Sequence, residues 1–290
     1  MPGLISFFKA LLFLFLPACI ACRNPSGVSP GSNEFVFSVL DVGQGLAQVG
    51  VVNGKAIAWD TGPESGFAGF VDGYGRLGSP SLGSIVISHS DSDHRGGLKE
   101  LPLSIVFSGE IIVSPYEDTA LIRSNSGVWK EKIMFRTMAR GDTLGGLDGV
   151  LVECIWPPGS LQCTSPFIQS GLKNTYSLCF MLQHGNSRCI ITSDIDTSAT
   201  TWLGIHDGYS LSADICVVPH HGSRSAADPV FYGYVGPQRV IVSCKKPPNN
   251  YGHPAPEILD LLFRINAVIM RTYDAGHVTA RSNGEYWQWE

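Results

Sequence analysis

The feature of this 290-residue chain that most constrains its fold is a repeated one: apolar, strand-like runs end in clusters of glycine, aspartate and histidine. The run "LGSIVIS" (Leu82–Ser88) leads directly into "HSDSDHRGG", and the runs "IITSD" and "VVPHHGS" end in the same manner. Runs rich in valine and isoleucine favour strands, and a strand end holds side chains rigidly while leaving them accessible. The pattern therefore predicts a strand-rich scaffold with a functional site assembled at strand ends.

The densest cluster is "SHSDSDHRGG", which places His89, Asp91, Asp93 and His94 within six positions. If these carboxylates were buried without partners, they would repel one another and lose solvation. Imidazole and carboxylate groups are both ligands of zinc, manganese and iron, and alternate residues of an extended segment point to the same side. The spacing therefore predicts a metal site with donors enough for two ions. A solvated acidic turn is the alternative for this segment alone.

Two later segments favour the metal hypothesis. Asp194 ends the apolar run "IITSD", although a lone aspartate at a strand end more often caps a turn. His220 and His221 follow a third apolar run. One histidine of this pair could bind metal, and the other could hold a ligand in place or contact substrate. Together, three strand-end clusters of metal-ligand residue types indicate one site that is split along the chain.

The remaining segments predict further strands and one clear helix. A hairpin with a type I′ turn is expected at Asn53-Gly54, and a second hairpin spans Ser177–Asp194. Pro256–Asn266 has proline in its first turn and apolar residues at helical spacing, so we expect a helix there. The glycine-rich stretch 63–80 indicates a helix only weakly.

The N-terminal residues predict export. The apolar run Leu11–Cys22 has the length of a signal peptide, and Cys19 and Cys22 each end a sequence similar to a bacterial lipoprotein box. We expect residues 1–22 to be a signal peptide with a lipid anchor on one of these cysteines; an uncleaved anchor helix is the alternative. Residues 23–33 are typical of a flexible tether. The mature protein is then expected in the periplasm or on the membrane of a bacterium.

Several motifs, in order along the chain, resemble the metallo-β-lactamase superfamily, and most closely the metallohydrolase domain of ComEC-like competence proteins. They are "LDVGQG" (Leu40–Gly45), "WDTG" (Trp59–Gly62), "SHSDSDHRGGL" (Ser88–Leu98), "WPP" (Trp156–Pro158), "NTYSL" (Asn174–Leu178), "TSDID" (Thr192–Asp196), "PHHGS" (Pro219–Ser223) and "YGHP" (Tyr251–Pro254). The D-x-D-H, HHGS and GHP elements distinguish this branch. The resemblance covers Glu34–Gly284, and the hydrolase domain would occupy residues 34–290.

This resemblance implies an α/β fold, a four-layer αββα sandwich with a metal site at one sheet edge. It also implies two divalent metal ions, zinc or manganese. The ligands that it implies are His89, Asp91, Asp93, His94, Asp194 and His220. Asp194 would bridge the two ions, and His220 would complete the second site. The aspartate at position 91, where many relatives in the superfamily carry histidine, favours manganese somewhat more than an all-histidine set would.

The resemblance further implies hydrolysis by a hydroxide that the two metal ions activate. Asp93 and Asp194 would orient this hydroxide, and His221 would protonate the leaving group. Asn174 stands where many relatives have another ligand histidine, so we expect it near the metal or the substrate. Ser223 and His253 are further candidates for substrate contact.

Two departures from the family pattern bear on activity. Leu46 stands where an aspartate usually follows GQG, and Ser193 stands where glycine usually precedes the bridging aspartate. The channel-forming membrane helices of full-length ComEC proteins have no counterpart after the N-terminal run, so we do not expect a transmembrane channel. Metal binding is expected in spite of these departures.

The leading hypothesis is an exported metal-dependent phosphodiesterase that acts on DNA or another phosphodiester. A formal charge of −5 argues mildly against broad nucleic-acid binding, but bound metal would change the local sign. Basic residues near the motifs could serve phosphates; they are Arg95, Lys173, Arg224, Lys245 and Lys246. The alternatives are a hydrolase of small esters, lactones or amides, and a metal-binding protein that has lost its activity.

Overall fold

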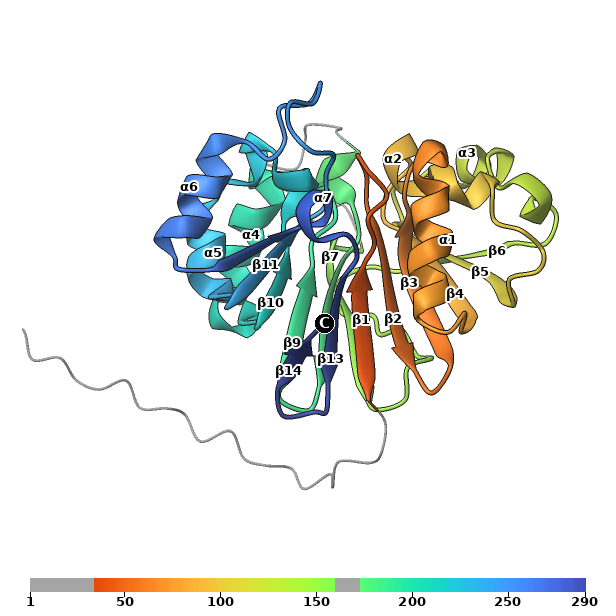
Figure 1. Cartoon of the computed structure of the whole chain (residues 1–290), viewed down its shortest axis with the longest axis horizontal. Helices are drawn as coiled ribbons and strands as arrows, with labels where there is room; N and C mark the ends of the chain where they lie inside the picture. The colour runs from red at the N-terminus through yellow and green to blue at the C-terminus, as the bar shows by residue number, and fades with distance from the viewer. Residues whose placement is uncertain (1–33, 160–172) are drawn as a thin grey trace, which may run out of the picture.

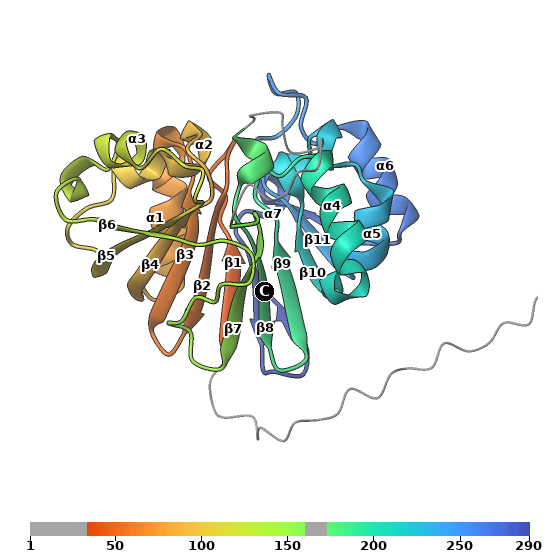
Figure 2. The same cartoon turned by 180° about the vertical axis from the view of Figure 1, so that it is seen from behind.

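Two β-sheets pack face to face and carry helices on their outer faces (Figures 1 and 2). The computed structural model describes residues 34–159 and 173–290. The expected four-layer αββα sandwich is confirmed. The predicted signal peptide, residues 1–22, and the predicted tether, residues 23–33, lie outside the described residues.

The first sheet has the strand order β14-β13-β1-β2-β3-β4-β5-β6. Its strands are β1 (Phe35–Val39), β2 (Ala47–Val52), β3 (Lys55–Thr61), β4 (Ser81–Ile87), β5 (Phe107–Val113), β6 (Met134–Thr137), β13 (Val278–Ser282) and β14 (Trp287–Trp289). The hairpin between β2 and β3 is confirmed: Asn53 and Gly54 have φ angles of 51° and 73°, and a type I′ turn needs positive φ at both positions. From β3 to β6 the strands run parallel.

The second sheet has the order β12-β11-β10-β9-β8-β7. Its strands are β7 (Val150–Trp156), β8 (Cys179–His184), β9 (Ser187–Ile191), β10 (Ile215–Val217), β11 (Arg239–Val242) and β12 (Val268–Arg271). The predicted second hairpin is formed by β8 and β9. From β9 to β12 the strands are parallel, so their carboxyl ends lie along one edge.

Helices cover the outer face of each sheet (Figure 1). The α-helices of the described residues are α1 (Phe67–Arg76), α2 (Ser92–Arg95) and α3 (Thr119–Ser124) beside the first sheet, and α4 (Thr197–Asp207), α5 (Pro229–Val235) and α6 (Pro256–Arg264) beside the second, while α7 (Thr272–Ala275) follows β12. The predicted helix at Pro256 is confirmed as α6. The weakly indicated helix in the stretch 63–80 is α1. Among the described residues, no helix has both the length and the apolar character needed to cross a membrane.

The main core lies between the two sheets. Trp59 of β3 packs edge-on against Phe37 of β1 and Phe180 of β8, and all three side chains are essentially inaccessible to solvent. Leu46 belongs to the same buried cluster. Burial of such aromatic and aliphatic side chains fixes the two sheets against each other, and with them the strand ends that carry the polar motifs.

Candidate metal centre

The predicted metal ligands lie on three segments that meet at one end of the sandwich. His89 follows β4, and His94 lies in α2 directly after it. Asp194 follows β9, and His220 and His221 lie in a short turn, Pro219–Gly222, after β10. Because β4 and the strands β9 and β10 all present their carboxyl ends here, residues more than 120 positions apart in sequence become neighbours.

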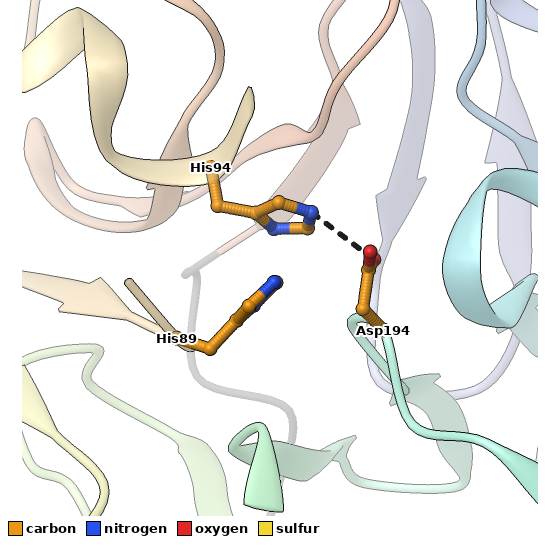
Figure 3. A group of neighbouring side chains, drawn as sticks. All are labelled: His89, His94 and Asp194. Atoms are coloured by element: carbon orange, nitrogen blue, oxygen red, sulfur yellow. Dashed lines mark ion pairs between the residues drawn. The ribbon is translucent and has the colours of Figure 1, made fainter. Parts of the chain in front are cut away.

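One group of donors consists of His89, His94 and Asp194 (Figure 3). Each offers one ligand atom, and these atoms all lie within 4.8 Å of one another. The closest approach is between His94 Nε2 and Asp194 Oδ1, at 3.1 Å. All three side chains are buried. The group therefore has the residue types, the spacing and the seclusion of a metal centre.

A second group consists of Asp93, His94 and His221. His221 Nε2 lies 3.3 Å from Asp93 Oδ2 and 3.2 Å from His94 Nε2. The same nitrogen is 3.4 Å from Asp194 Oδ2. His94 thus belongs to both groups, and Asp194 of the first group contacts His221 of the second. The donors are therefore sufficient for two adjacent ions.

Outer hydrogen bonds fix how the two central histidines face the site. The Asp60 carboxylate accepts a hydrogen bond from His94 Nδ1 at 2.7 Å, and the carbonyl oxygen of Ser243 accepts one from His221 Nδ1 at 2.9 Å. Both acceptors lack a proton to give, so each histidine carries its proton on Nδ1. Each Nε2 therefore faces the carboxylates of the site, as in metal-bound histidines with a carboxylate or carbonyl partner.

Asp60 is itself held by β4. Its two carboxylate oxygens accept hydrogen bonds from the backbone N–H of Ser88 at 2.8 Å and from the Ser88 hydroxyl at 2.7 Å. Asp60 adopts a φ angle of 59° at the end of β3. This backbone turn directs the buried carboxylate beneath α2, where it orients His94.

Without a cation, the site has unmet electrostatic demands. His89 Nε2 and Asp194 Oδ1 are buried, and neither makes a hydrogen bond of good geometry. Each has only an ionic neighbour among the described residues, Asp91 Oδ2 at 3.5 Å for His89 and His94 Nε2 at 3.1 Å for Asp194. Burial alone would lower the pKa of His221, but the Asp194 and Asp93 carboxylates beside it raise that pKa to about 9. Burial likewise opposes the shift at His94, whose pKa Asp194 and Asp60 raise well above its usual value. A divalent cation would satisfy the same atoms, so the residues fit a metal.

Asp91 and His220 lie at the rim of the site. Asp91 Oδ2 is 3.5 Å from His89 Nε2, and its other carboxylate oxygen is 3.5 Å from Lys173 Nζ. His220 Nε2 is 3.7 Å from Asp194 Oδ2 and within hydrogen-bond distance, 3.3 Å, of Asn174 Nδ2. The geometry thus places His221, rather than His220, against the second group. Both histidines have left-handed backbone angles, φ 50° and 55°, which direct the consecutive rings differently.

The three predicted substrate residues differ in their position. Asn174 and His253 both face the rim: the ring of His253 lies 5.7 Å from that of His220 and 6.2 Å from that of His221. Burial, together with these neighbouring histidines, lowers the pKa of His253 to about 4. Ser223 instead accepts a hydrogen bond from the Ser225 hydroxyl. That hydroxyl lies 3.3 Å from His220 Nδ1, so the Ser223 side chain is linked to the His220 ring through Ser225, while the Ser223 backbone N–H donates to the His220 carbonyl oxygen at 2.8 Å.

Two residues near the site were absent from the predictions. Glu117 follows β5 and interacts with Ser90 beside His89, and burial raises its pKa. Gln44 connects the glycine turn 43–45 to the rim, because its side chain lies 3.5 Å from His253 Nδ1 and accepts a hydrogen bond from the backbone N–H of Lys245. The position of Glu117, in the turn that follows the buried end of β5 at Val113, was a weak signal in the sequence.

The structure shows where the two departures from the family pattern, Leu46 and Ser193, lie. The Leu46 side chain points into the core between the sheets, while its backbone N–H donates to the carbonyl of Asp93 at 3.1 Å. Ser193 has a φ angle of 47°, the left-handed conformation that glycine adopts freely. Gly45 is confined by the site: a Cβ atom on it would lie 2.4 Å from the Asp93 carbonyl oxygen.

Comparison with known proteins agrees with this architecture. No protein-family model matches the chain. The chain is 25% identical over 288 residues to competence protein ComA of Neisseria gonorrhoeae, covering 94% of this chain and 37% of that protein. It is 26% identical over 208 residues to ComE operon protein 3 of Bacillus subtilis, covering 70% of this chain and 25% of that protein. The chain therefore spans well under half the length of these curated relatives.

Solved structures are similar over most of the described chain. A metal-dependent hydrolase of the β-lactamase superfamily matches with a TM-score of 0.52 and 14% identity, over 83% of this chain and 97% of that one. The metallo-β-lactamase fold protein YhfI from Bacillus subtilis matches with a TM-score of 0.53 and 9% identity, over 88% and 100%. The chain thus has the metallo-β-lactamase fold and is similar in sequence to a part of the ComEC-like competence proteins, as its motifs predict.

Proposed function

We propose that this protein is a metal-dependent hydrolase of phosphodiesters. The observation that carries the proposal is the convergence of five buried or half-buried donors, His89, Asp93, His94, Asp194 and His221, around two overlapping groups. Two divalent ions, zinc or manganese, would be held there, with Asp194 between them and Asp91 at the outer side of His89. When bound, such ions supply Lewis-acid chemistry and lower the pKa of water.

The chain's own residues then have distinct roles. Asp93 and Asp194 would orient the attacking water, since their carboxylates face each other across His221 Nε2. We assign the histidine pair differently from the sequence-based expectation, because His221 Nε2 lies 3.4 Å from Asp194 Oδ2 and His220 Nε2 lies 3.7 Å from it: His221 would bind metal, and His220 would face the substrate. Asn174 would keep the His220 ring in place through their 3.3 Å contact.

Cations around the site support a phosphodiester rather than a neutral ester or lactone. Within the described parts of the chain, Arg95, Lys245 and Lys246 take part in no ion pair, whereas Lys173 faces Asp91 and Arg224 faces Glu257. Arg95 also lines a surface cavity of about 520 Å³ beside α2, together with Lys99. Positive side chains without a carboxylate partner remain available for phosphates. The competence proteins among the relatives make DNA the first substrate to test.

The expected export belongs to the same proposal. Residues 1–22 would direct the chain to the cell envelope, with a lipid on Cys19 or Cys22. Mass spectrometry of the protein recovered from bacterial membranes tests this: an intact, unmodified N-terminus would contradict it.

Activity assays on the full-length chain test the proposed chemistry. Bound metal would be measured first, and bis(p-nitrophenyl) phosphate, DNA and a panel of lactones would then be assayed with Zn²⁺ or Mn²⁺. We expect phosphodiester cleavage that Asp93→Ala reduces at least 100-fold, because its carboxylate lies in the second donor group. Asp148→Ala is the matched control, since Asp148 pairs with Lys55 at the start of β3, far from the site. Lactone turnover alone, or bound metal without any turnover, would contradict the proposal.

A further inference from the structure

A projecting loop beside the candidate metal centre carries an exposed tyrosine and two lysines. The loop, residues 243–254, connects β11 to α6 and rises above the sheet ends in Figures 1 and 2. Tyr251 is 65% exposed. Lys245 and Lys246 are also exposed and, as noted above, unpaired within the described residues. An exposed aromatic ring on the same loop as two lysines without an ion pair has no evident structural purpose.

The loop is held in one conformation by its own polar groups. The Asn249 side-chain amide donates hydrogen bonds to the carbonyl oxygens of Lys245 and His253. Its side-chain oxygen accepts hydrogen bonds from the backbone N–H groups of Tyr251 and His253, at 3.1 and 3.2 Å. Gln44 anchors the start of the loop to the glycine turn. Tyr251 is therefore presented on a preorganised support, which reduces the entropy lost when a ligand binds.

Three rings lead from the metal centre to the loop tip. The rings of His221 and His253 lie 6.2 Å apart with their planes 25° from parallel. The rings of His253 and Tyr251 lie 6.1 Å apart with their planes at 34°. The row begins at a donor of the second group and ends at an exposed aromatic face, with Lys245 and Lys246 on the same loop.

We propose that the loop 243–254 is a base-stacking platform for single-stranded nucleic acid. One unpaired base stacks on Tyr251, and Lys245 and Lys246 contact neighbouring phosphates, so that the strand extends along the ring row toward the metal centre. Aromatic stacking combined with a basic surface is the general mode by which proteins bind single strands without strong sequence preference. A duplex buries the faces of its bases, and the platform therefore favours an unpaired strand. This inference rests on the proposed phosphodiesterase function and narrows its substrate.

Binding to matched oligonucleotides tests the platform. The full-length chain would carry Asp93→Ala, in zinc, so that affinity is measured without cleavage. Fluorescence anisotropy would compare an oligothymidine with an abasic strand of the same length and charge, and with a duplex. We expect the oligothymidine to bind most tightly, and Tyr251→Ala to weaken its binding roughly tenfold while leaving the abasic strand unaffected. Tyr251→Trp should retain the preference, because indole also stacks.

Control variants separate stacking from charge and from misfolding. Tyr209→Ala removes a tyrosine that is 81% exposed in the segment after α4, and it should change neither affinity. The double variant Lys245→Gln with Lys246→Gln should weaken the binding of the oligothymidine and of the abasic strand by a similar factor, and it should lower the salt dependence of binding. If Tyr251→Ala affects the two strands equally, or affects neither, the platform is wrong. Equal affinity for duplex and single strand would also overturn it.

The platform and the proposed function can fail separately. Absence of cleavage of bis(p-nitrophenyl) phosphate by the wild-type chain, with the stacking difference intact, would remove the hydrolase and leave a nucleic-acid-binding protein. Cleavage of that small phosphodiester without any effect of Tyr251 on strand binding would keep the hydrolase and remove the platform.

Discussion

Ser193 occupies a conformation that its side chain does not favour. It precedes Asp194 with a φ angle of 47°, and its hydroxyl is buried without a hydrogen-bond partner. A left-handed backbone costs a non-glycine residue about 1–2 kcal/mol, and an unsatisfied buried polar group costs about as much again. The position therefore carries strain immediately beside a central donor of the site.

Replacing Ser193 with glycine should relieve this strain. We expect Ser193→Gly to raise the free energy of unfolding by about 1 kcal/mol, because the gain is partly offset by the greater freedom of glycine in the unfolded chain. Urea denaturation of the metal-free protein measures it. Ser187→Gly is a matched control, because Ser187 is also buried with an unpartnered hydroxyl but lies within β9. Glycine inside a strand should lower the free energy of unfolding by about 1 kcal/mol. A loss of stability in both variants would contradict the explanation.

Only some residues of the candidate site could be predicted from residue type and spacing. Residue type and spacing predicted His89, Asp93, His94 and Asp194, and the structure brings their ligand atoms together because strand-end donors in parallel strands converge. Their binding of metal stays a prediction. Residue type and spacing could not rank His220 against His221, since the difference comes from two consecutive left-handed residues in the turn after β10. A positive φ is uncommon for any non-glycine residue, and although histidine adopts it more often than most, residue type alone does not predict it at two consecutive positions.

At the scale of elements, Asp228 accepts hydrogen bonds from two helices, α4 and α5, that pack beside the second sheet. It caps α5, where its Oδ1 accepts hydrogen bonds from the backbone N–H groups of Val230 and Phe231. Its other carboxylate oxygen accepts hydrogen bonds from the hydroxyls of Thr200 and Thr201 in α4, both at 2.9 Å. The side chain is buried, so one carboxylate satisfies donors from both helices.

Loss of this carboxylate should cost more than loss of an ordinary cap. We expect Asp228→Ala to lower the free energy of unfolding by about 3 kcal/mol, since it removes a cap and two hydrogen bonds from α4 hydroxyls to a charged acceptor, although Thr200 keeps the Thr197 carbonyl oxygen as an acceptor. Asp118→Ala is the comparison: Asp118 caps α3 on an exposed surface and makes only the two capping bonds, so about 1 kcal/mol is expected. Thermal and urea denaturation of both variants measure the difference. Equal costs would show that the bonds to α4 contribute nothing.

The elements that the sequence predicted well are those with a strong local signal. The hairpin at Asn53-Gly54 is specified locally by its turn residues, and the helix from Pro256 by proline in its first turn and apolar residues at helical spacing. By contrast, α1 contains three glycines and was only weakly indicated. One of them, Gly69, lies so close to the Asp41 carbonyl that a Cβ atom would approach it to 2.0 Å. Close packing against the loop selected glycine there, and tertiary contacts stabilise a helix that propensity disfavours.

At the scale of the whole molecule, the candidate metal centre joins the two halves of the sandwich. His89, Asp93 and His94 come from the first sheet and its helix, whereas Asp194 and His221 follow strands of the second sheet. Ions bound there would link segments that the chain itself connects only through long stretches. Metal binding is thus expected to stabilise the native state of the entire fold.

Bound metal should also reverse the way in which these histidines respond to pH. In the metal-free protein, the pKa of His221 is about 9, above its ordinary value of 6.5, so its contribution to stability is complete below pH 6.5 and is lost as the pH rises through 9. The raised pKa of His94 acts in the same direction. Metal binding instead requires deprotonated ligands, and protons compete with it at low pH. The stabilisation that metal provides should therefore grow as the pH rises.

Melting temperatures at pH 6 and pH 8.5, in EDTA and in excess Zn²⁺, test this directly. We expect zinc to raise the melting temperature at both values, and the increase to be larger at pH 8.5. At about 100 times the dissociation constant, the stabilisation would amount to about 2.7 kcal/mol. Asp194→Asn should abolish most of the zinc effect, because Asp194 contacts donors of both groups. A zinc effect that is equal at the two pH values, or that survives Asp194→Asn, would place the bound ion outside this cluster. The expectation that bound metal links the two halves of the sandwich would then be wrong.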